Sequence, residues 1–222
     1  MEPAAQCTAC ITAKQHIKPF PKTSCMEIKR IRDLTVSDVW GPACTQAPGG
    51  DQYFVTFTDG KSRQTMTYFM KHKSEAFEKF KLYKSFVETQ TGNKLKKLHA
   101  DGGGEYLSKE FKKYLLENGT QQDTTTPHSS SQNGIVECLN QMLVEHAHAM
   151  LHQHQLPNSL WKEAIAYATY LKNRSLTQAI KDLKVPDEVF WGKKPDVSHL
   201  EEFSKKCWVL QQNEKISKLD PK

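Results

Sequence analysis

The sequence predicts an α/β domain in which three strands are followed by a helix, a strand, a helix, a strand and further helices. Residues 33–71 contain three short apolar runs separated by turns rich in glycine and proline, which is typical of β-strands. From residue 74 onward, apolar residues recur every three to four positions, as in helices that pack on a core. A chain of 222 residues is long enough for one such domain with additional segments.

The first predicted strand covers residues 33–40, with the sequence DLTVSDVW. Alternation places Asp38 on the same face as the apolar residues Leu34, Val36 and Trp40. A carboxylate on a buried face is costly unless it binds a partner, so Asp38 is a candidate functional residue. The alternative is that the strand ends earlier and Asp38 caps a turn.

The next two strands are predicted at residues 53–60 and 63–71. The run YFVTFTDG is apolar on one face and nearly so on the other, as expected of a central strand. Asp59 and Gly60 suit a tight turn, after which the chain returns. Residues 33–71 therefore predict an antiparallel meander.

A helix is predicted to begin at Ser74 and to close around Gly92. Its apolar stripe is expected to comprise Phe77, Phe80, Phe86 and Val87. The strand 94–101 follows and ends in Asp101, directly before three glycines. An acid at the carboxyl end of a strand, beside glycines that permit close approach of the backbone, is typical of α/β active sites. The alternative is a plain exit from the strand into a loop.

The second half of the domain is predicted to contain three helices and one strand. Helices are expected at Ser108–Asn118, 134–154 and 158–174, a strand at 120–126, and a polar loop at 126–134. Four residues of the first of these helices are expected to face inward: Phe111, Tyr114, Leu115 and Leu116.

Glu137 falls in the first turn of the helix that begins near residue 134, beside its apolar stripe. The helix dipole favours an acid there, so an ordinary surface glutamate is the alternative to a functional one. Farther along, His148 and His152 lie four residues apart. A solvated helix face explains this pair better than a metal site, because no catalytic glutamate lies between the two histidines.

Asp38, Asp101 and Glu137 are separated by sixty-two and then thirty-five intervening residues. If they converge, three carboxylates cannot all remain ionised without a counter-charge. Oxygen ligands of this kind suit Mg²⁺ or Mn²⁺. Two such ions can hold the attacking and leaving oxygens of an in-line phosphoryl transfer. The three acids therefore predict a metal-dependent enzyme that cuts and joins DNA strands.

Charge and hydropathy indicate what kind of partner the protein binds and in which compartment it is found. The formal net charge of +6 favours a polyanionic partner, although many soluble domains are mildly basic. The sequence has no run of 18 apolar residues, and therefore no predicted membrane span. Without the apolar stretch of a signal peptide, we expect an intracellular protein whose six cysteines are reduced thiols.

Residues 1–30 are predicted to form an arm that contains one C-x-x-C pair, Cys7 and Cys10. A structural zinc site usually needs four ligands, commonly two such pairs. His16 and Cys25 could complete a site within this sequence, although neither has a convincing spacing. The alternative is that the pair is the downstream half of a Zn²⁺ site whose upstream ligands are missing.

Several segments together resemble the integrase region of copia-type LTR retrotransposons, within the retroviral integrase superfamily. They are CTACITAKQHIKPFPKTS, SDVWGP, YFVTFTDGKSR, ADGGGEY, TTPHSSSQNGIVE, LPNSLWKEAIAYATYLKNRS and WGKKPDVSHL, in the family's order. The resemblance implies an RNase H-like fold with a five-stranded mixed sheet flanked by helices. It further implies a remnant of the zinc-binding segment at 1–30, a catalytic core at 31–175 and a mostly irregular extension at 176–222.

The resemblance also implies roles for individual residues. Asp38, Asp101 and Glu137 match the D,D-35-E triad, which binds two Mg²⁺ or Mn²⁺ ions. Cys7 and Cys10 match the last two ligands of a His-His-Cys-Cys zinc site. Candidates for contact with DNA are Asn133, Gly134, Asn140, Lys109 and Lys112.

The implied activity is DNA integration, with 3′-end processing of the element followed by strand transfer into target DNA. The implied partners are the element ends, the target DNA and further copies of the chain in a homo-oligomer, and the implied site of action is the nucleus.

Two departures from the family pattern support an alternative. Cys138 and Gln141 stand where the family usually has arginines, which removes two cations from a surface expected to face phosphate. The histidines of the zinc site are also not in this sequence. The alternative is a catalytically silent module, domesticated or decayed, that binds nucleic acid or protein. An RNase H-type nuclease is a third interpretation, disfavoured because the surrounding segments resemble those of integrases.

Overall fold

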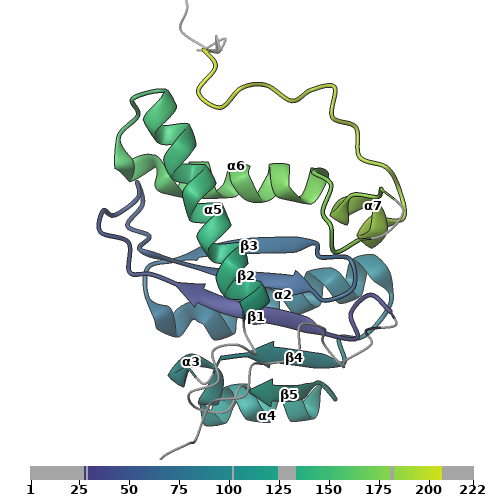
Figure 1. The fold of residues 1–222 in the computed structure, drawn as a ribbon. Coiled ribbons are helices and arrows are strands. Elements are labelled where there is room, and N and C mark those ends of the chain that lie inside the picture. The colour runs from purple at the N-terminus through teal and green to yellow at the C-terminus, as the bar shows by residue number, and fades with distance from the viewer. Residues whose placement is uncertain (1–27, 29, 102, 125–133, 181–182, 207–222) are drawn as a thin grey trace, which may run out of the picture.

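The computed structural model describes residues 28, 30–101, 103–124, 134–180 and 183–206. A five-stranded mixed sheet lies at the centre, in the order β3-β2-β1-β4-β5 (Figure 1). Its strands are β1 Thr35–Trp40, β2 Tyr53–Asp59, β3 Thr65–Met70, β4 Lys97–Ala100 and β5 Gln121–Thr124. The first three strands pair antiparallel, whereas β4 runs parallel to β1 and β5 parallel to β4. The predicted meander and mixed sheet are confirmed.

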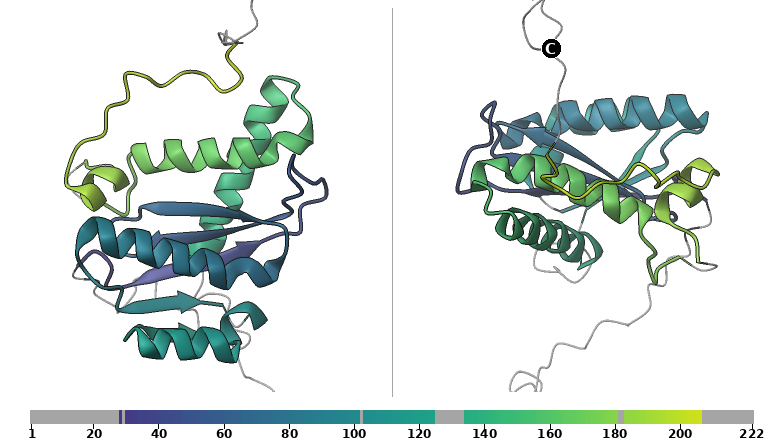
Figure 2. Two further views of the ribbon diagram at one scale, coloured as in Figure 1. Left: turned by 180° about the vertical axis from the view of Figure 1, so that it is seen from behind. Right: turned by 90° about the horizontal axis from the view of Figure 1, so that it is seen from above.

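Helices cover both faces of the sheet. The longer ones are α2 Ala76–Thr91, α4 Lys109–Glu117, α5 Gly134–Gln153 and α6 Trp161–Arg174, and the shorter ones are α3 Gly104–Leu107 and α7 Pro186–Trp191. Seen from above, α2 lies on one side of the sheet and α5 and α6 lie on the other (Figure 2). Single turns of 3₁₀-helix, η1 Lys73–Glu75 and η3 Asn158–Leu160, precede α2 and α6.

Strand β2 contributes to a separate core on each face. Val55 and Phe57 belong to a core with side chains of α2, α3 and α4, whereas Phe54 belongs to a core with α5 and α6. All three side chains are fully buried. The apolar character of both faces of this run, visible in the sequence, follows from its position between two layers of helices.

Two predicted helix boundaries are confirmed: the end of α2 at Gly92 and the start of α4 at Ser108. Gly92 ends α2 in the left-handed conformation at φ 67°, which an L side chain rarely adopts. Ser108 caps α4, since its side chain accepts a hydrogen bond from the backbone N–H of Phe111 at 3.2 Å. These caps fix where α2 turns into β4 and where α3 turns into α4.

Two residues expected in the core are exposed. The side chain of Phe86 on α2 is 45% exposed and meets Trp191 edge-on, and Leu116 on α4 is 82% exposed. The prediction was wrong because apolar residues outnumber the positions that face the sheet. The buried positions of α2 are instead held by Ala76, Phe80, Tyr83, Lys84 and Val87.

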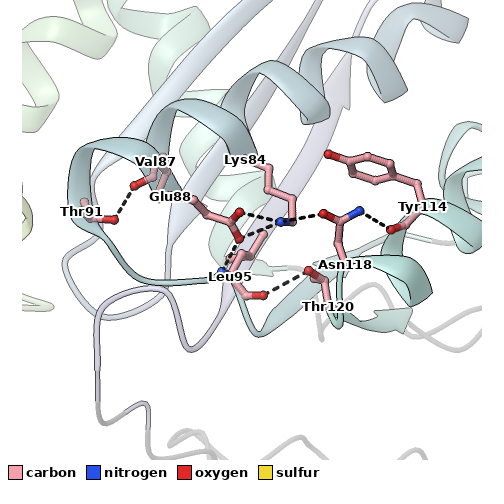
Figure 3. A network of polar contacts seen from close by, with 8 residues as sticks. All are labelled: Lys84, Val87, Glu88, Thr91, Leu95, Tyr114, Asn118 and Thr120. Atoms are coloured by element: carbon pink, nitrogen blue, oxygen red, sulfur yellow. Dashed lines mark hydrogen bonds and ion pairs between the residues drawn. The ribbon is translucent and has the colours of Figure 1, made fainter.

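A buried ion pair on α2 connects this helix to the segment before β4 and to the end of α4 (Figure 3). The Lys84 side chain is 3% exposed and donates to both carboxylate oxygens of Glu88, each at 2.7 Å, and to Asn118 at 3.4 Å. Glu88 also accepts from the backbone N–H of Leu95 at 2.8 Å. The hydroxyl of Thr120 donates to the backbone carbonyl of Leu95 at 3.1 Å. A buried charge is tolerated here because it is paired and its partner is itself hydrogen-bonded.

The described part of the segment after α6, residues 175–180 and 183–206, is irregular apart from α7, but it packs on the domain. Phe190 of α7 is 5% exposed and packs in the same core as α2. An ion pair of 3.0 Å between Arg174 and Asp187 connects α7 to the end of α6. Farther on, the Tyr170 hydroxyl meets the His199 ring at 2.7 Å. Among the described residues, no helix combines the length and apolar character needed to cross a lipid bilayer.

Candidate active site

The fold brings three acidic residues to one region of the sheet. Asp38 lies on β1, and Asp101 directly follows β4, the parallel neighbour of β1. Parallel neighbours end at the same edge of a sheet, so the two acids meet there. Glu137 lies in the first turn of α5, which begins against β1 (Figure 1). We refer to Asp38, Asp101 and Glu137 as the acidic centre.

The electrostatics of Asp38 reflect this convergence. The pKa of Asp38 is raised from 3.8 to about 6, first by burial and then by the negative charges of Asp101 and Glu137. Hydrogen bonds from Asn140 and from the backbone of Val39 oppose the rise. Asp101 and Glu137 therefore both lie close enough to Asp38 to repel its carboxylate.

Asn140 takes a different position from the predicted one. It was expected to contact DNA, but the residue is 3% exposed, and its amide nitrogen donates to a carboxylate oxygen of Asp38 at 2.8 Å. Its amide oxygen accepts from the hydroxyl of Thr56 on β2 at 3.1 Å. Asn140 lies one turn after Glu137 on α5, so its amide ties the helix that carries one acid to the strand that carries another.

Replacing Asn140 with alanine should raise the pKa of Asp38 further, because it removes the amide donor that stabilises the carboxylate. NMR titration of the Asp38 carboxyl carbon measures this pKa. Gln141→Ala is the matched control, because the neighbouring amide of Gln141 donates to Glu145 at 2.8 Å and not to Asp38. It should leave the pKa of Asp38 unchanged. An Asp38 pKa that is the same in Asn140→Ala and in the unaltered protein would contradict the assignment.

The segment after Asp101 adds residues to which the sequence alone assigned no role. The backbone N–H of Gly103 donates to Asp101 at 3.2 Å. Tyr106 of α3 is fully buried, and its hydroxyl lies 2.7 Å from the hydroxyl of Ser37 on β1. Burial, together with the charges of Asp38, Asp101 and Glu105, raises the pKa of Tyr106 well above its usual value, so the phenol stays neutral. The motif ADGGGEY was the available signal for these residues.

The donor chemistry of the acidic centre fits a hard divalent cation. All three groups are carboxylates, and the repulsion that raises the pKa of Asp38 would be relieved by positive charge. Within the described part of the chain, however, no three His, Cys, Asp or Glu side chains lie close enough together to hold an ion. Simultaneous ligation by all three acids therefore requires side-chain movement. Glu137, which is exposed, has room for it.

The remaining candidates lie elsewhere or outside the described residues. Lys109 is exposed at the start of α4. Lys112 lines a surface hollow with Lys97, at the end of β4 opposite to Asp101. Gly134 is the first residue of α5. Three further candidates lie outside the described residues: Cys7, Cys10 and Asn133. The zinc prediction is therefore not tested by the structure.

Comparison with known proteins identifies the family that this geometry suggests. Residues 31–130 match the family described as "Integrase core domain". The match includes Asp38 and Asp101 of the acidic centre and ends before Glu137.

The curated relatives are polyproteins of plant retrotransposons. The chain is 38% identical over 216 residues to the retrovirus-related Pol polyprotein from transposon TNT 1-94 of Nicotiana tabacum, which covers 97% of this chain. It is 29% identical over 202 residues to the Pol polyprotein from transposon RE2 of Arabidopsis thaliana, which covers 91% of this chain. The chain spans 16% and 14% of the length of these two relatives. The predicted resemblance to copia-type integrases is confirmed.

Solved structures of retroviral integrases share the fold. A simian T-cell lymphotropic virus intasome, in complex with a PP2A regulatory subunit, aligns with a TM-score of 0.65 and 16% identity over 90% of this chain and 69% of its own. The HTLV-2 integrase catalytic core in complex with magnesium, in a trimeric form, aligns with a TM-score of 0.53 over 72% of this chain and 96% of its own. The fold of this chain is therefore RNase H-like, as predicted.

Proposed function

We propose that this chain is the catalytic core region of a retrotransposon integrase, which uses Mg²⁺ or Mn²⁺ to process the 3′ ends of element DNA and to join them to target DNA. The observation that carries the proposal is the convergence of the acidic centre. Three carboxylates from β1, the end of β4 and the start of α5 lie close enough that Asp101 and Glu137 both raise the pKa of Asp38. This convergence occurs within a domain of the integrase core family.

In this proposal the residues of the site have different roles. Asp38, Asp101 and Glu137 would hold the divalent cations. When bound, such cations activate a nucleophilic oxygen and stabilise the charge that develops on the phosphate. Asn140 keeps Asp38 oriented through its 2.8 Å hydrogen bond. Tyr106 and Ser37 form a neutral hydrogen-bonded pair that connects α3 to β1 next to Asp38.

The proposed partners follow from the same comparison. The structural neighbours include an intasome and integrase cores in dimeric and trimeric forms, both in complex with magnesium. For this chain we propose DNA as substrate, a homo-oligomer as the active form and the nucleus as the place of action. The net charge of +6 supports an electrostatic attraction to DNA.

The second candidate is a silent module that retains binding but not chemistry. Cys138, one of the two residues found where the family usually has arginines, is exposed beside Glu137. The other is Gln141, which is exposed and hydrogen-bonded to Glu145. Neither side chain supplies the positive charge that would bind phosphate on this surface of α5.

A disintegration assay distinguishes the two candidates. A branched DNA that mimics the integration product is incubated with the chain and Mn²⁺, and the resolved strands are measured. We expect product from the unaltered chain and a loss of roughly 10²-fold or more in Glu137→Gln, because a ligand of the cations is removed. Glu145→Gln, an exposed acid two turns farther along α5, is the matched control and should retain activity.

Absence of product from a folded, unaltered chain would favour the silent module. Restoring arginine at positions 138 and 141 then tests whether the missing cations are the cause. Recovery of activity in that double variant would assign the loss to these two positions.

A further inference from the structure

An ion pair beside the acidic centre has no role in the proposed metal chemistry. Lys73 of η1 lies with its ammonium 3.1 Å from a carboxylate oxygen of Glu105 on α3. The Lys73 side chain is 48% exposed, whereas the Glu105 side chain is only 6% exposed. A buried acid thus holds one end of the pair in place, and the ammonium lies at the protein surface.

A series of adjacent residues connects this pair to the acidic centre. Gly103 donates its backbone N–H to Asp101 at 3.2 Å. The carboxylate of Glu105 packs against the same glycine so closely that a Cβ at position 103 would come within 2.7 Å of it. Asp101, Gly103, Glu105 and Lys73 are therefore successive neighbours. A side chain at position 103 would have to displace the carboxylate that holds Lys73.

The charges are consistent with this arrangement. Burial lowers the pKa of Lys73, but the hydrogen bond and charge of Glu105, together with the charges of Asp101 and Asp38, outweigh it and raise the pKa above its ordinary value. Lys73 is therefore a fixed cation in the field of the acidic centre. The backbone before it is also held, since Glu75 accepts from the N–H groups of Lys71 at 3.1 Å and His72 at 3.0 Å.

The Lys73 ammonium is the partner found for the buried oxygen Oε1 of Glu105 among the described residues, at 3.1 Å. A surface ion pair of this kind contributes little to stability, because one partner is half exposed to water. A role in holding the ammonium toward a ligand explains the buried acid better than a contribution to stability does.

We propose that Lys73 is a substrate-positioning residue, held by Glu105 at the rim of the acidic centre so that its ammonium binds a phosphate of the DNA strand that enters there. The inference rests on the proposed function, because it takes DNA as the substrate. A lysine ammonium binds phosphate as a point charge, and such contacts fix the register of the backbone rather than read its bases.

The test measures how the affinity for a short DNA duplex depends on salt, by fluorescence anisotropy. Removing one cation that binds a phosphate should reduce the slope of log K against log salt concentration by about 0.9. We therefore expect Lys73→Met to bind severalfold more weakly at low salt, with a slope smaller by about 1. Lys73→Arg should restore the slope, because it keeps the charge. Lys81→Met is the matched control, since Lys81 also lies in an ion pair, with Glu78 on α2.

Glu105→Gln separates positioning from simple charge. Removing a negative charge near DNA would by itself strengthen binding. If Glu105 holds Lys73 in place, Glu105→Gln should instead weaken DNA binding. The double variant Lys73→Met/Glu105→Gln should bind DNA no more weakly than Lys73→Met alone. Thermal unfolding of each variant identifies any loss of folding, and Lys73→Gln, which also removes the charge, takes the place of Lys73→Met if that variant is unfolded.

The outcomes separate this inference from the proposed function. A salt slope unchanged in Lys73→Met, with normal DNA binding by the unaltered chain, would overturn the role of Lys73 and leave the proposed function standing. Tighter binding by Glu105→Gln would overturn the anchoring role of Glu105. Absence of DNA binding by the unaltered, folded chain would overturn both the inference and the proposed function.

Discussion

Replacing Asp38 with asparagine should abolish strand transfer and, without divalent metal, make the folded protein more stable at pH 7. The reason for the gain in stability is that the surroundings of Asp38 disfavour its charged form. Burial and the charges of Asp101 and Glu137 raise its pKa from 3.8 to about 6 in the folded chain. At pH 7 the protein therefore carries a carboxylate whose charge opposes folding.

The sign follows from proton binding. Between about pH 4 and pH 6 the folded chain binds more protons at Asp38 than the unfolded chain does, so stability falls as the pH rises through this window. The loss is complete above about pH 6 and absent below about pH 4. Asparagine carries no charge and can still accept the hydrogen bond from Asn140. We expect Asp38→Asn to gain on the order of 2 kcal/mol at pH 7 and almost nothing near pH 4.

Urea unfolding at pH 4 and pH 7, in the presence of a chelator, measures the difference. Asp51→Asn is a suitable control, because Asp51 is paired with Lys162 at 2.5 Å, away from the acidic centre. A gain of the same size at both pH values, or a loss at pH 7, would contradict the prediction. If the acidic centre binds Mg²⁺, the ion should stabilise the unaltered chain more than Asp38→Asn.

Replacing Phe80 with alanine should cost about 3–5 kcal/mol of unfolding free energy, the largest loss of stability we expect from a single substitution. Phe80 lies on α2 and is fully buried. Its ring stacks on Phe111 of α4 with centroids 5.1 Å apart and lies 5.9 Å from Phe57 of β2. The substitution would leave a cavity where β2, α2 and α4 meet, and the rigid aromatic neighbours cannot close it fully.

Phe86→Ala is the matched control on the same helix. Its ring is 45% exposed, so the same loss of atoms should cost less than about 1 kcal/mol. Denaturant unfolding of the two variants against the unaltered chain measures both values. Equal losses at positions 80 and 86 would show that the core of this face is not centred on Phe80.

The pair Phe80 and Phe86 illustrates a limit of the sequence. Both fit an apolar stripe on α2, because helical spacing gives the direction of a side chain but not what lies opposite it. Only the packing of α2 against the sheet decides that Phe80 is covered and that Phe86 reaches the surface beside Trp191. For the same reason Leu116 appeared to face inward, although it is 82% exposed.

The sequence by itself determined the order of the strands and main helices along the chain, where α2 ends and α4 begins, and the three acids of the proposed active site. These depend on local chemistry: alternation in strands, glycine after helices, and acids that stand out among apolar residues. The resemblance to copia-type integrases also rested on local segments, and the comparisons confirm it.

Only the tertiary structure decided how residues distant in the sequence share one region. Asn140 looked like a DNA contact, yet the packing of α5 on β1 directs its amide to Asp38, 102 positions away. Lys73 and Glu105 gave no signal, because an ion pair between η1 and α3 has no sequence spacing that predicts it. The physical reason is that such contacts are set by how helices pack on the sheet, which depends on the whole core rather than on neighbouring residues.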